Sequence, residues 1–123
     1  MRIGAPAQNS AGWHSLENDG SRQFRWTESA ETVLGEYAFV EGINYIALSV
    51  IMAIEPGFLN TSSLRIGPDI VPLAGNIGKI SAQYTSPVTR RFWVSLLTPQ
   101  PIKPCIVNRD SPDQRELGLA LLI

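Results

Sequence analysis

The sequence predicts an all-β domain: a two-sheet antiparallel β-sandwich, jelly-roll-like, of about eight or nine strands. Apolar and polar residues alternate in several segments, whereas no segment longer than about eight residues keeps a helical repeat. Nine prolines and ten glycines separate many of these segments. The breaks recur at intervals of about 8–12 residues, which is typical of sandwiches and barrels. An up-and-down barrel is the alternative architecture.

The longest alternating run, residues 44–54, predicts one long strand whose first face carries Ile46, Leu48 and Val50. Residues 79–85 and 91–96 alternate in the same way and predict two further strands with one face in the core. Shorter strands are predicted at 23–27, 31–35, 63–66, 69–73, 102–107 and 116–122. Turn residues at 55–57, 67–69, 74–76, 86–87, 99–101 and 108–112 mark the breaks between strands.

The length of 123 residues is that of one domain. Residues 1–11 are expected to be a flexible N-terminal segment, and residues 12–123 a single sandwich domain. A formal net charge of −1 leaves no electrostatic basis for binding nucleic acid. The longest apolar run, near 46–54, is too short for membrane insertion, and the start of the chain has no apolar leader. We therefore expect a cytoplasmic protein.

Cys105 is the only cysteine, so an internal disulfide and a site with several thiolates are excluded. We expect it to be a buried, inert thiol in the strand at 102–107. No motif in the sequence indicates a metal or another cofactor.

Trp13, Phe24 and Trp26 form an aromatic cluster near the start of the chain. Phe24 and Trp26 share one side of a predicted strand and are expected to point inward, which turns Arg25 outward. Trp13 precedes the strand, so its place is more open. We interpret Arg25 together with Asp113 and Arg115 as a structural clamp that joins the first and last strands.

A sugar-binding face usually combines an aromatic surface with planar hydrogen-bonding side chains, because a pyranose has an apolar CH face and a rim of hydroxyls. The best aromatic candidate is Trp93, because its neighbours Phe92 and Val94 are expected to point into the core and alternation then turns Trp93 outward. The alternative is that Trp93 is itself in the core. The other candidates away from the core are Tyr45, Arg91, Gln83 and Lys79. Trp93 and Tyr45 in one concave groove would favour sugar binding.

Trp13, His14 and Glu17 are further candidates near the start of the chain. His14 and Glu17 are an acid–base pair on paper, and Ser15 and Asp19 complete a serine–histidine–acid set. Neither set lies in a motif such as a nucleophile elbow, so we expect no enzyme.

The two ends of the chain carry a recognisable combination of motifs. Gly12 and Trp13 followed by Glu17 lead into the stretch Phe24-Arg25-Trp26-Thr27, and residues 113–121 read DQRELGLAL. This combination resembles a small β-sandwich domain, similar in build to carbohydrate-binding modules, that is attached to bacterial glycosyltransferases of surface-polysaccharide synthesis. The sequence departs from that pattern at His14, where an aromatic residue often follows the tryptophan, and we expect it to be an isolated domain with no transferase attached.

The resemblance implies a non-catalytic accessory module of polysaccharide or glycoconjugate assembly, with a glycan and a glycosyltransferase as partners. The competing interpretation is a structural or protein-interaction sandwich that self-associates or docks on a partner enzyme through an exposed sheet face.

Overall fold

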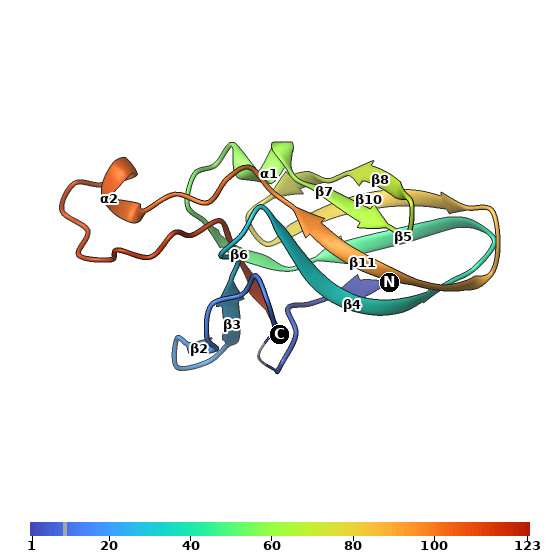
Figure 1. The fold of residues 1–123 in the computed structure, drawn as a ribbon, viewed down its shortest axis with the longest axis horizontal. Coiled ribbons are helices and arrows are strands. Elements are labelled where there is room, and N and C mark those ends of the chain that lie inside the picture. Colours follow the sequence, from blue (N-terminus) through green and yellow to red (C-terminus); the bar gives the residue numbers. More distant parts are fainter. Residues whose placement is uncertain (9) are drawn as a thin grey trace.

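The structure is a computed structural model that describes residues 1–8 and 10–123, and within them it confirms an all-β protein (Figure 1). Three four-stranded sheets replace the two that the sequence predicted. The first contains β1 (Arg2–Ile3), β5 (Gly42–Leu48), β10 (Lys79–Ser86) and β9 (Ala74–Asn76), in that order. The second contains β4 (Glu31–Phe39), β11 (Arg90–Leu97), β7 (Ser63–Ile66) and β8 (Asp69–Pro72). The third contains β2 (Glu17–Asn18), β3 (Gln23–Trp26), β12 (Leu119–Leu122) and β6 (Val50–Ala53).

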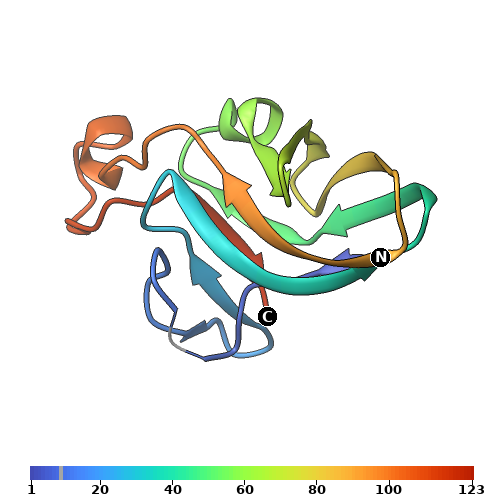
Figure 2. The same cartoon turned by 45° about the vertical axis from the view of Figure 1, so that its right-hand side comes forward.

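The first two sheets form the two halves of a sandwich and share one apolar core. In Figure 2, β4 and β11 run side by side along one layer, in agreement with their eight-residue antiparallel register. Ile80, Ala82 and Tyr84 of β10 and Val94 and Leu96 of β11 are buried, as their alternation predicted. The exposed residues between them therefore form two outer faces, one on each side of the molecule.

Three aromatic side chains, those of Phe39, Tyr84 and Phe92, pack against one another in the shared core. Phe39 meets Tyr84 edge to face with ring centres 5.6 Å apart, and Phe92 lies 5.9 Å from Phe39. The Tyr84 hydroxyl donates a hydrogen bond of 2.8 Å to Asp69. These contacts tie β8, the end strand of the second sheet, to β10 of the first.

The predicted strand at 44–54 is two strands in two different sheets. The chain leaves the first sheet after Leu48 and enters the third at Val50, with Ser49 between them. Leu48 and Val50 are both buried, so the alternation continues through the corner and conceals it. A register shift between β6 and β12 then leaves Met52 exposed, whereas one continuous strand would have buried it.

The N-terminal segment, which was expected to be flexible, instead contributes the strand β1 to the fold. Arg2 and Ile3 pair in parallel with Ala47 and Leu48, and Ile3 is buried in the shared core. The Ala5 N–H donates to the Leu122 carbonyl at 2.8 Å. Two paired residues are too few for alternation to reveal.

The predicted strand at 102–107 is also wrong. Ile102 makes a single bridge to Leu117, and the chain then turns into the short helix α2 (Pro104–Val107), which projects from the body of the fold (Figure 1). Pro104 lies in the first turn of α2, where its fixed φ and missing N–H suit a helix. Cys105 is therefore a partly exposed helical residue instead of a buried one in a strand.

The structure also contains a second short helix and a short strand that the sequence did not predict. The helix α1 (Phe58–Thr61) follows the turn at 55–57 and buries Phe58 in the core. β9 occupies the predicted turn at 74–76 and pairs with β10. Gly75 fits there because a Cβ atom would lie 2.3 Å from the Lys79 carbonyl oxygen.

The third sheet joins the two ends of the chain, because β3 pairs with β12. Phe24 and Trp26 are buried, as predicted, but they form a separate small cluster with Leu117 and Ala120. Gly118 lies so close to Thr27 that a Cβ atom would be 2.3 Å from its hydroxyl. That hydroxyl accepts a hydrogen bond of 3.0 Å from the Leu119 N–H.

Candidate functional site

Trp93 lies on the outer face of the second sheet, with 62% of its surface exposed. Its neighbours Phe92 and Val94 turn toward the core, so the alternation of β11 directs the indole outward. The backbone is held on both sides, by pairing with Glu36 on β4 and by a hydrogen bond of 3.1 Å from the Gly67 N–H to the Trp93 carbonyl. The alternative that Trp93 is a core residue is therefore wrong.

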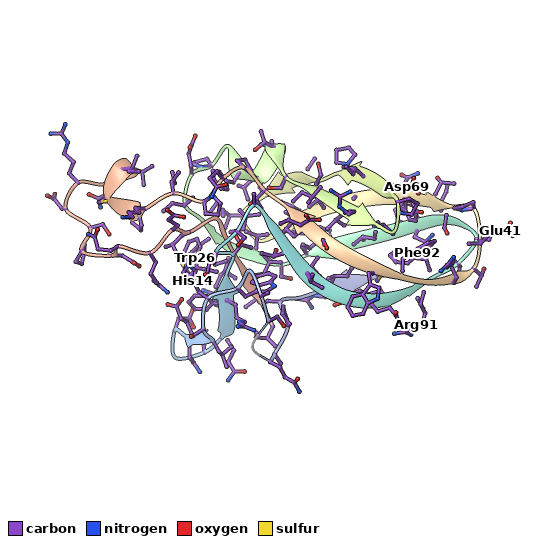
Figure 3. The ribbon with its side chains drawn as sticks, in the orientation of Figure 1. His14, Trp26, Glu41, Asp69, Arg91 and Phe92 are labelled. Atoms are coloured by element: carbon purple, nitrogen blue, oxygen red, sulfur yellow. The ribbon has the colours of Figure 1, made fainter. Side chains whose placement is uncertain are left out.

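An ion pair lies beside Trp93 on the same face. The Arg91 Nε donates to Glu36 Oε1 at 2.8 Å, and Arg91 Nη2 donates to the Glu36 carbonyl at 3.2 Å. Figure 3 shows Arg91 outside the ribbon of β4 and β11, whereas Phe92 points between the layers. Both ends of the pair are well exposed, so the guanidinium and the carboxylate keep capacity for further hydrogen bonds.

A second ion pair crosses the same sheet farther along β11. Arg65 Nε on β7 donates to Glu31 Oε1 on β4 at 2.9 Å, passing over the position of Ser95. Sequence analysis selected Arg91 and missed Glu36, Glu31 and Arg65. Glu31 and Arg65 lay on predicted strands, but only the strand order shows that β4 and β7 flank β11.

Tyr45 and Gln83 face away from Trp93, on the other side of the sandwich. They are direct cross-strand partners on β5 and β10, and 67% of the surface of Tyr45 is exposed. They line an open hollow of about 450 Å³ together with Met1, Ala47, Pro72, Lys79 and Ser81. Trp93 and Tyr45 therefore do not share the single groove that would have favoured sugar binding, because the two rings belong to different sheets.

The candidates near the start of the chain are held by contacts within the fold. Trp13 is buried, and its indole N–H donates to the Val33 carbonyl at 2.9 Å. His14 lies beside β3, near Trp26 (Figure 3), with Nε2 2.7 Å from the Glu116 carbonyl oxygen and Nδ1 3.6 Å from a Glu28 carboxylate oxygen. Among the described residues, its ring nitrogens thus contact a carbonyl and a carboxylate, and neither partner is a serine hydroxyl.

Glu17 belongs to a clamp that the sequence predicted only in part. Arg115 donates from Nη1 to Glu17 Oε2 at 2.9 Å and from Nη2 to Asp113 Oδ2 at 2.8 Å. The side-chain and backbone hydrogen bonds from Arg115 lower the pKa of Asp113 from 3.8 to about 2. The side-chain hydrogen bonds to Asp113 and to Glu17 raise the pKa of the Arg115 guanidinium above its usual value. Asp113 and Arg115 therefore join β2 to the segment before β12.

Arg25 is not part of that clamp and does not point outward, so both predictions for it are wrong. Its side chain is only 1% exposed. Its Nε donates to the His14 carbonyl at 2.8 Å, and its Nη1 donates to the carbonyls of Pro6, at 3.0 Å, and Gln8. Arg25 thus fastens the N-terminal segment over the third sheet.

Residues 1–8 and 10–123 contain no group of three or more histidine, cysteine, aspartate or glutamate side chains arranged to hold a metal ion. In the same part of the chain, no helix is long and apolar enough to cross a membrane. Comparisons with protein-family models, with curated proteins and with solved structures find no match to this chain.

Proposed function

We propose that the protein is a non-catalytic carbohydrate-binding module that holds a sugar on the Trp93 face of its jelly-roll-like sandwich. The observation that carries the proposal is an indole that is 62% exposed, on a sheet, next to the ion pair of Arg91 and Glu36. The indole offers an apolar surface to the CH face of a pyranose ring. The guanidinium donates to sugar hydroxyls and the carboxylate accepts from them.

The composition of this face favours a sugar over a protein surface. Val33 and Ile70 are also exposed on the outer side of the second sheet, which favours the alternative of self-association or docking on an enzyme. However, Ser95 and Arg65 separate them along one row of cross-strand partners. Polar residues therefore interrupt this row, and the ion pair of Glu36 and Arg91 lies beside the indole, which suits a ligand rich in hydroxyls.

The biological role follows from the resemblance of the two ends of the chain to sandwich domains attached to glycosyltransferases. We propose a cytoplasmic accessory module that holds a glycan during polysaccharide or glycoconjugate assembly, with a glycosyltransferase as partner. Most residues of the resemblance lie in the third sheet and its clamp, whereas Trp93 lies in the second sheet. These residues support the resemblance to those sandwich domains, whereas the Trp93 face supports the proposed sugar binding.

A glycan array followed by calorimetry tests the proposal. We expect Trp93→Ala to weaken binding of the selected glycan roughly tenfold or more, because the stacking surface is lost, and Trp93→Phe to retain part of it. Ile70→Ala is the matched control, since it removes another exposed apolar side chain from the same sheet.

The proposal fails if no glycan binds, or if Trp93→Ala binds as tightly as the unaltered protein. Sedimentation velocity on the same samples distinguishes the alternative. A dimer that forms with rising concentration and is lost in Trp93→Ala would assign this face to self-association.

A further inference from the structure

The hollow on the first sheet lies where small side chains stand between larger ones. Ala47 and Ser81 are direct cross-strand partners and both are small, so they form a low floor. Tyr45 and Gln83, the next pair on the same side of β5 and β10, rise at one end. Lys79, two residues before Ser81 on β10, lies at the other end, and Met1 and Pro72 also line the hollow. The volume of about 450 Å³ lies in the range of small-molecule sites.

The chemistry of the walls is mixed in a way that suits a sugar ring. Tyr45 supplies an exposed aromatic face, Gln83 supplies an amide that both donates and accepts, and Ser81 supplies a hydroxyl. These groups are set on adjacent, paired strands, so their spacing is fixed by the sheet. A pyranose ring stacked on Tyr45 would place its rim over the amide and the hydroxyl.

Among the described residues that line the hollow, the charged side chain is that of Lys79, which is positive. Lys79 is exposed, and none of the ion pairs among the described residues involves it. The lining residues include no aspartate or glutamate. By contrast, Arg65 and Arg91 on the opposite Trp93 face each form an ion pair with a glutamate. Of these two faces, the hollow is therefore the one where, among the described residues, a side-chain cation outside any ion pair is open to an anionic group.

We propose that this hollow is a second binding site, separate from the Trp93 face, and that it takes an acidic sugar unit of the hexuronic acid class. The ring packs on Tyr45, and the carboxylate pairs with the Lys79 ammonium at the far end of the floor. A charge-assisted hydrogen bond to a carboxylate is stronger than one to a hydroxyl, so the acid is preferred over its neutral counterpart. The site does not depend on sugar binding at Trp93.

The experiment is a titration of the ¹⁵N-labelled protein, followed by amide chemical shifts, with D-glucuronate and D-galacturonate. The neutral sugars D-glucose and D-galactose and inorganic sulfate are titrated in parallel. We expect shift changes at residues 45–47 and 79–83 with the uronates. Lys79→Met should weaken uronate binding roughly tenfold and leave the neutral sugars unaffected. Tyr45→Ala should weaken both.

The chain offers a matched control, because Lys79 and Lys103 are its two lysines. Lys103→Met removes the same charge outside the hollow and should leave uronate binding unchanged. The proposal is overturned if the uronates cause no shifts at these residues, or if Lys79→Met binds them as well as the unaltered protein. Sulfate binding with equal affinity would reduce the site to one for simple anions. Binding confined to the Trp93 face would refute the hollow and leave the proposed function standing.

Discussion

Replacing Arg25 by methionine should destabilise the protein more than any surface substitution, because Arg25 holds the N-terminal segment in place from a buried position. Among the described residues, the guanidinium donates to the backbone carbonyls of Pro6, Gln8 and His14. Methionine has a similar length and fills much of the space, but it donates no hydrogen bond. The carbonyls then lose a charged donor in a place where the arginine is only 1% exposed.

The size of the effect follows from these three bonds. A hydrogen bond to a charged group contributes about 1.5 kcal/mol or more, so three of them contribute about 4.5 kcal/mol. Releasing the guanidinium from its buried site offsets part of that loss. We expect the free energy of unfolding to fall by about 3 kcal/mol, a large share of the 5–15 kcal/mol that is usual for a domain.

Urea unfolding followed by tryptophan fluorescence and by circular dichroism measures the change. Arg109→Met is the control, since Arg109 is exposed, and it should alter the free energy of unfolding by no more than about 0.5 kcal/mol. Arg25→Lys should lie between the two, because a lysine keeps the charge and loses the planar fork. A loss below about 1 kcal/mol for Arg25→Met would refute the reasoning that these bonds hold the segment.

Two further predictions concern the closing segment. Gly118→Ala should cost about 1–3 kcal/mol in urea unfolding, because its Cβ would clash with the Thr27 hydroxyl at 2.3 Å. Thr27→Ala removes that hydroxyl, so additive losses in the double variant would contradict the clash. The folded-state pKa of Asp113, about 2, lies below its ordinary 3.8, so its contribution is complete above about pH 4 and is lost as pH falls toward 2. In Asp113→Asn, the free energy of unfolding, followed by the urea midpoint, should therefore fall less steeply over that pH range. The difference should be less than about 1 kcal/mol, because the pair with Arg115 is exposed. An unchanged slope would refute this prediction.

Alternation predicted the fold class and several faces correctly because it records a local property. Residues two apart in a strand point to the same side, so the buried face of β10 could be read from Ile80, Ala82 and Tyr84. The exposure of Trp93 followed from the same rule. The rule failed where the chain changes sheets at Ser49, since the period of two continues through the corner.

Other failures came from contacts between distant parts of the chain. Arg25 was expected to point outward, because an arginine on a strand opposite two aromatic residues usually meets solvent. The N-terminal segment covers Arg25 and accepts its hydrogen bonds at the carbonyls of Pro6 and Gln8. No local pattern in the sequence indicates that this segment lies over β3. The helix at Cys105 had a local signal in Pro104, which the apolar residues around it outweighed in the prediction.

The sequence by itself determined that the chain is all-β and which side chains of the central strands leave the core. Those properties depend on residue type and on a spacing of two, which are local. The tertiary structure alone decided that Tyr45 and Trp93 lie on opposite faces, because β5 and β11 belong to different sheets. Which sheet a strand joins depends on the free energy of burying whole faces against each other, a sum over residues far apart in the chain.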